Sequence, residues 1–163
     1  VHAEAPTNLG AKIALVNGIG RRSQMGLLVD VSVPVGDDEF TSDYVVPKVL
    51  FLRSHSLSDR HGLTHNIGPS FVIEKSNGES DTHVDLNYAV ALNGGFGPNF
   101  SLFGELYGAF ATGSGRLDRH SFQAGATILL SRLFQIDIRG GVGLVNNEPD
   151  WLVGAGFAFR VPR

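Results

Sequence analysis

Apolar and polar side chains alternate with a period of two along most of this chain. In the segment VDLNYAVALN, which covers 84–93, Asp85 and Asn87 separate Val84, Leu86 and Tyr88. Successive side chains of a β-strand point to opposite faces, so this pattern predicts strands with one apolar and one polar face. Apolar spacing typical of helices is almost absent. The sequence therefore predicts an all-β fold.

The alternating segments recur about nine times, and each covers roughly nine to thirteen residues. Clusters of Gly, Pro, Asn, Asp and Ser separate them. The expected strands are 9–16, 24–35, 46–57, 63–74, 82–93, 100–111, 121–130, 134–144 and 151–161. Because no helix interrupts the series, we expect an up-and-down antiparallel meander, with residues 1–163 forming a single domain.

The breaks between these strands alternate in character. Those at 94–99 and 131–133 are short, whereas those at 36–44, 75–81, 112–119 and 145–150 are mostly longer and more polar. Up-and-down barrels of the bacterial outer membrane have short turns on one rim and longer loops on the other. Ten residues at about 3.3 Å each, tilted near 45°, also span roughly the apolar band of such a barrel. The meander is therefore expected to form all or part of a transmembrane β-barrel.

Sorting each strand by face separates a continuous apolar stripe from a face that combines glycines, amides and charges. The stripe includes Leu27, Val90, Ile128 and Ile138. On the other face acidic and basic residues are balanced, which suits a confined, wet interior better than a free surface. We expect the polar side chains to line a lumen while their neighbours face lipid. The expected lumen-lining residues are Asp30, Arg53, Asp85, Asn87, Glu105, Gln123, Asp137, Arg139 and Arg160.

Composition excludes several classes of function. The chain has no cysteine, so neither a disulfide framework nor a thiolate metal site is possible. A net charge of −3 without a basic run gives no reason to expect nucleic acid as a partner. With 21 glycines and only 18% charged residues, the composition is unusual for a soluble enzyme. We expect no cofactor and no metal.

Two groups of residues could form a chemical site, but each also has an ordinary structural interpretation. His55, His61 and His65 could bind a metal, but their spacing suits a helix and no helix is predicted here. We therefore interpret them as rim and loop histidines. His120, Ser121 and Asp118 could serve a lipid hydrolase. Adjacent strand residues point to opposite faces, so His120 and Ser121 are not expected to touch.

Pairs of charged or polar residues on one face need no catalytic explanation. His83 shares a face with Asp85, and Asp137 shares one with Arg139. A network of hydrogen bonds and ion pairs in the lumen explains both pairs. Aromatic residues near strand ends predict an interfacial girdle formed by Tyr44, Trp151 and Phe159.

Several spaced motifs resemble one family. They are SVPVGDDEF (32–40), PKVLFLRSHSLSDRHGLTHNIG (47–68), FSLFGELYG (100–108) and FQIDIRGGVGLVNNEPDWLVGAGFAFR (134–160). Together they resemble the carboxy-terminal part of outer-membrane proteins named after the meta-pathway of phenol degradation. The resemblance implies an outer-membrane β-barrel that moves small, often hydrophobic compounds, and it brings no catalytic or binding residues. Members of that family have further strands upstream of Leu9, so we expect an amino-terminal truncation.

Three functions are consistent with these features. The first is a non-enzymatic outer-membrane channel or transporter that admits small, hydrophobic or aromatic compounds. The second is an outer-membrane enzyme acting on lipid, and the third is a soluble β-barrel that binds a hydrophobic ligand inside. The face on which the apolar stripe lies distinguishes the first from the third, because a soluble barrel would bury Val90 and Ile138 and expose Asp85.

Overall fold

The computed structural model describes residues 7–16, 23–33, 45–76, 79–113 and 115–161. These residues form one antiparallel sheet of nine strands in the order β1 to β9, so the predicted all-β meander is confirmed. The strands are β1 (Thr7–Val16), β2 (Ser23–Val33), β3 (Val46–Ser56), β4 (His61–Ser76), β5 (Glu79–Gly95), β6 (Phe100–Phe110), β7 (Arg119–Leu129), β8 (Phe134–Gly143) and β9 (Leu152–Phe159). Within the described residues, no helix is long and apolar enough to cross a membrane.

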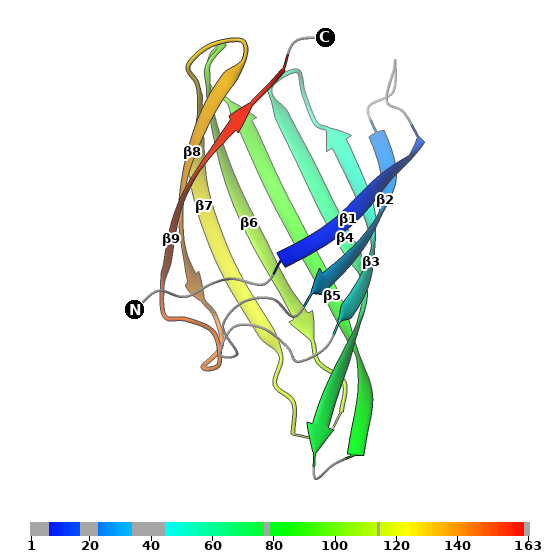
Figure 1. Cartoon of the computed structure of the whole chain (residues 1–163). Coiled ribbons are helices and arrows are strands. Elements are labelled where there is room, and N and C mark those ends of the chain that lie inside the picture. The colour runs from blue at the N-terminus through cyan, green and yellow to red at the C-terminus, as the bar shows by residue number, and fades with distance from the viewer. Residues whose placement is uncertain (1–6, 17–22, 34–44, 77–78, 114, 162–163) are drawn as a thin grey trace.

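The sheet curls around a central space, as Figure 1 shows, but it does not close. Every strand pairs with its neighbours in sequence, and β1 and β9 form the two edges. Because the number of strands is odd and every pairing is antiparallel, both edge strands run in the same direction. Direct pairing of the two edges would therefore be parallel.

The two rims of the curled sheet differ. The rim that we name the short-turn rim carries the turns 57–60, 96–99 and 130–133, each closed by a backbone hydrogen bond such as Phe96 N to Phe100 O at 2.8 Å. The opposite rim, named the long-loop rim, carries the connections 111–118 and 144–151. The expected loop at 75–81 is mostly strand instead, since pairing continues to Ser76 and Glu79. Backbone hydrogen bonds do not depend on side-chain polarity, so the ladder extends through this polar segment.

Strand register fixes the two faces of the sheet. One cross-strand row joins Asp30, Lys48, Ser70 and Asp85, and we name its face the inner face. The next residue of each strand belongs to the outer face, which carries the apolar stripe. Glu105, Gln123, Asp137 and Arg139 lie on the inner face, as the alternation predicts.

Burial is inverted relative to a soluble protein. Among the described residues, Leu52 and Ala109 are the buried apolar side chains, whereas Ser70, Asp85, Ser121 and Gln123 are buried polar ones. Asp85 is 0% exposed, while the outer-face residues Val90 and Ile138 are 43% and 60% exposed. The large apolar side chains of this fold therefore cover its outside rather than fill a core.

Candidate functional site

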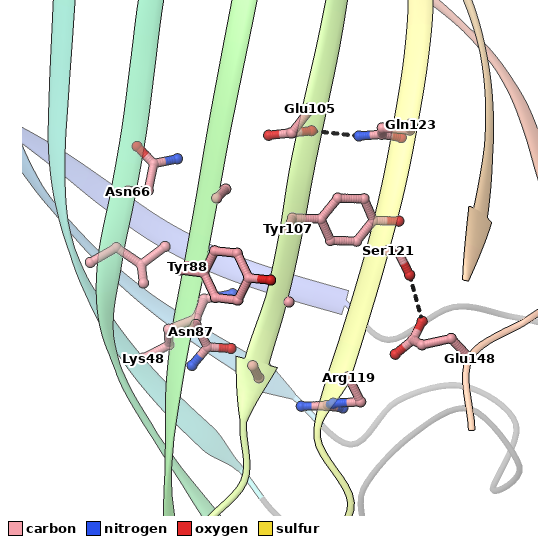
Figure 2. Close-up of a pocket in the computed structure, with 14 residues that line it drawn as sticks. Lys48, Asn66, Asn87, Tyr88, Glu105, Tyr107, Arg119, Ser121, Gln123 and Glu148 are labelled. Atoms are coloured by element: carbon pink, nitrogen blue, oxygen red, sulfur yellow. Dashed lines mark hydrogen bonds between the residues drawn. The ribbon is translucent and has the colours of Figure 1, made fainter. Parts of the chain in front are cut away.

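A pocket of about 410 Å³ opens on the inner face toward the long-loop rim. Strands β3 to β7 supply most of its lining, and Glu148 reaches it from the connection between β8 and β9. Figure 2 shows its polar side chains around a common space. The labelled residues whose side chains lie around it are Lys48, Asn66, Asn87, Glu105, Tyr107, Arg119, Ser121, Gln123 and Glu148. Tyr88 also borders the pocket, but the register places its side chain on the outer face.

Glu105 and Gln123 form a hydrogen-bonded pair across β6 and β7. They are direct partners in the register, and the Gln123 side-chain amide donates to Glu105 Oε2 at 2.5 Å. Gln123 is only 8% exposed. The Gln123 amide therefore gives the Glu105 carboxylate a hydrogen-bond donor within this partly buried surface.

Asp85 is the centre of a buried ion-pair cluster. Arg116 contacts both of its carboxylate oxygens, with Nη2 3.0 Å from Oδ2, and Arg119 Nη2 lies 3.4 Å from Oδ2. A buried charge is tolerated when it is paired and hydrogen-bonded, as here. Arg116 belongs to the connection between β6 and β7, so the side chain of a loop residue contacts the inner face of the sheet.

Further hydrogen bonds join the two ends of the same connection and attach it to β5. The backbone N–H of Ala111 donates to Asp118 Oδ1 at 2.9 Å. Thr112 Oγ1 donates to the carbonyl of Val84 at 2.5 Å and accepts from its N–H at 3.1 Å. The loop is therefore held by hydrogen bonds on both sides of Arg116.

A second ion pair continues the polar band toward the edge at β1. Lys48 Nζ lies 3.1 Å from Asp30 Oδ2, as their position in one row allows. Between this pair and Asp85, the Asn87 amide donates to Ser70 Oγ at 2.8 Å. Predicted lumen residues Asp30, Asp85 and Asn87 thus belong to one continuous polar surface.

Glu148 comes from the long-loop rim and reaches β7. Its carboxylate accepts a hydrogen bond from Ser121 Oγ at 3.0 Å, and Ser121 is buried. The N–H of Gly143 donates to the carbonyl of Pro149 at 2.9 Å and holds the loop against β8. The sequence pattern did not identify Arg116 and Glu148, because both lie in loops. Alternation along a strand predicts which face a side chain is on, but it does not apply to loop residues.

Asp137 and Arg139 lie opposite glycines on β9. Arg139 pairs with Gly154 and Asp137 pairs with Gly156. A Cβ at Gly154 would lie 2.8 Å from Arg139 Nε, and one at Gly156 would lie 2.9 Å from Asp137 Oδ2. The glycines leave the space that the two charged side chains occupy, so the Gly-x-Gly spacing of β9 serves the polar face.

One predicted lumen residue lies on the other face. Arg53 is on the outer face, because its partners in the register are Met25 and His65. Lys48 and Arg53 are separated by an odd number of positions on β3, so they cannot share a face, and pairing with Asp30 places Lys48 inside. Arg160 follows the end of β9, where it is exposed and its N–H donates to the carbonyl of Leu133 at 2.8 Å.

The candidate hydrolase residues are divided between the two faces. Ser121 lies on the inner face with Glu148, whereas His120 lies on the outer face, where Nδ1 is 3.0 Å from Tyr88 Oη. Asp118 Oδ2 is 4.0 Å from His120 Nε2. A nucleophile and its base need direct hydrogen-bond contact, which this placement does not give.

The remaining histidines show hydrogen-bonding and stacking contacts. His55 and His65 stack on the outer face with ring centroids 5.5 Å apart. His61 Nδ1 lies 2.9 Å from Ser58 Oγ in the turn 57–60, and His83 Nε2 lies 3.5 Å from Asp81 Oδ2. In the part of the chain that the structure describes, no group of three or more His, Cys, Asp or Glu could hold a metal ion.

Two of the three predicted girdle residues, Trp151 and Phe159, lie at the ends of β9. Trp151 precedes β9 and is 71% exposed, and Phe159 ends the same strand and is also exposed. One therefore marks the long-loop rim and the other the short-turn rim. Tyr44 lies outside the described residues.

A family model matches almost the whole chain. The family described as "Putative MetA-pathway of phenol degradation" matches residues 5–161. No curated protein matches the chain at a significant level.

Proposed function

The chain belongs to the family named for the MetA pathway of phenol degradation, and from this premise we propose that it is a β-barrel protein of the bacterial outer membrane. Its role is that of a channel or transporter rather than an enzyme. The polar inner face forms the route, and the permeants are small, hydrophobic or aromatic compounds. The lipid bilayer is its main partner.

The inversion of burial carries this proposal. Val90 and Ile138 are exposed on the outer face while Asp85 is fully buried on the inner face. Water would penalise so large an apolar exterior, whereas the hydrocarbon of a bilayer would solvate it. The same inversion argues against a soluble barrel that keeps its apolar residues inside for a ligand.

The composition of the pocket supports the class of permeant. Leu50, Ala89 and Ala109 supply apolar surface, and Tyr107 adds an aromatic ring. Asn66 and Asn87 line the same space and offer donors and acceptors. A small molecule with an apolar body and one polar group would contact both kinds of surface.

Replacement of Ile138 by Arg tests the bilayer assignment. Ile138 lies near the middle of β8 on the outer face, so a charge there should destabilise the protein in lipid vesicles by about 2–4 kcal/mol. The matched control is Gln135→Arg, which introduces the same side chain on the inner face of the same strand. Equal free energies of unfolding for the two variants would contradict the bilayer assignment.

Two further measurements test the role. The refolded protein should give ion conductance in planar bilayers, and its absence would oppose a channel. Phospholipid hydrolysis by the refolded protein that disappears in His120→Ala would instead favour the lipid enzyme.

A further inference from the structure

The outer face carries one group of basic and imidazole side chains near the short-turn rim. We name Arg53, His55 and His65 the basic cluster. Arg53 and His55 alternate on β3, and His65 is the register partner of Arg53 on β4. The two imidazole rings stack at 5.5 Å, so the three side chains form one patch.

Apolar residues surround this cluster on the outer face. Phe51, Ile67, Val90 and Leu92 are large and exposed, and they occupy neighbouring positions on β3, β4 and β5. A cation among these residues needs a polar or anionic partner nearby, because hydrocarbon does not solvate a charge. Arg53 is three residues from the end of β3, which places it about 10 Å from the rim, within reach of the headgroup region.

Among the described residues, no carboxylate forms an ion pair with Arg53. Its Nε donates to Ser23 Oγ at 3.4 Å, and no acidic side chain among the described residues lies within ion-pair distance of it. The hydrogen bond to Ser23 uses only one of the five guanidinium N–H groups. The remaining N–H groups of the planar guanidinium can donate to two oxygens of one phosphate group.

We propose that the basic cluster binds the phosphate of an anionic phospholipid. Arg53 supplies the fixed positive charge, and His55 and His65 supply further N–H donors at its side. The acyl chains of the lipid would lie along the apolar outer face toward the middle of the bilayer. In outer-membrane barrels short turns face the periplasm, so the lipid belongs to the periplasmic leaflet. This inference rests on the proposed membrane location.

Lipid retention measured by native mass spectrometry tests the site. The refolded protein in detergent would be titrated with phosphatidylglycerol and, separately, with phosphatidylcholine. Arg53→Gln should weaken retention of phosphatidylglycerol about fivefold and leave phosphatidylcholine unchanged. Arg53→Lys keeps the charge but not the planar fork, so it should lose less than Arg53→Gln.

Arg60→Gln is the matched control, because Arg60 lies in the exposed turn 57–60 at the same rim. It removes the same charge without changing the basic cluster and should retain phosphatidylglycerol like the wild type. Equal losses in Arg53→Gln and Arg60→Gln would show general charge attraction and overturn the site. Displacement of the lipid by inorganic phosphate, but not by chloride of equal ionic strength, would make it a free-phosphate site and also overturn the proposal.

Folding into vesicles separates this inference from the proposed function. A wild-type protein that inserts into vesicles but retains both lipids equally would refute the basic cluster as a lipid site and leave the membrane role intact. A wild-type protein that does not insert would refute the membrane role itself.

Discussion

At the scale of single residues, the hydrogen bond between Glu105 and Gln123 contributes to the stability of the inner face. A hydrogen bond to a charged group contributes more than one between neutral groups, so Glu105→Gln should lower the free energy of unfolding by about 1–2 kcal/mol. Asp59→Asn, in the exposed turn 57–60, should change it by less than about 0.5 kcal/mol. Urea unfolding in vesicles measures both. Indistinguishable variants would show that Glu105 does not lie in a confined environment.

At the scale of elements, the connection between β6 and β7 depends on Asp85. Asp85→Asn removes the carboxylate that Arg116 and Arg119 both contact, and breaking such a buried pair costs about 3–5 kcal/mol. We expect the loop to detach, so that trypsin cleaves after Arg116 faster than in the wild type. Asp81→Asn is the control at the same rim, because Asp81 contacts only His83 among the described ion pairs. Unchanged cleavage in Asp85→Asn would contradict the anchoring.

At the scale of the whole molecule, the inner face has excess negative charge along the pocket. Lys48 is paired with Asp30, and Arg116 and Arg119 are both paired with Asp85, whereas Glu105 and Glu148 contact the neutral donors Gln123 and Ser121. These three cations and four carboxylates leave a net charge of −1. The wild type should therefore prefer cations, and Glu105→Gln combined with Glu148→Gln should shift the reversal potential toward anions. Planar-bilayer recording in a salt gradient measures the shift. A reversal potential that does not move, as expected for the control Asp59→Asn, would exclude these carboxylates from the ion path.

The sequence by itself determined the strands, their order and most of the two faces. A period of two ties every side chain of a strand to one face, so Asp85, Glu105 and Asp137 could be assigned to the inner face without knowing any contact. Antiparallel neighbours follow from short turns between consecutive strands. The family resemblance was also contained in the sequence, and the match over residues 5–161 confirms it.

Only the tertiary structure decided which residues complete the site. Arg116 and Glu148 reach the inner face from loops, whose path depends on distant partners such as Asp85 and Ser121 rather than on local periodicity. On β3 the alternation is ambiguous, because the inner face carries leucines and each face carries a cation. Pairing with β2 and β4 shows that Lys48 lies on the inner face and Arg53 on the outer face. The physical reason is common to both cases. Local sequence fixes the direction of a side chain relative to its own strand, whereas contacts between strands and loops fix what that side chain meets.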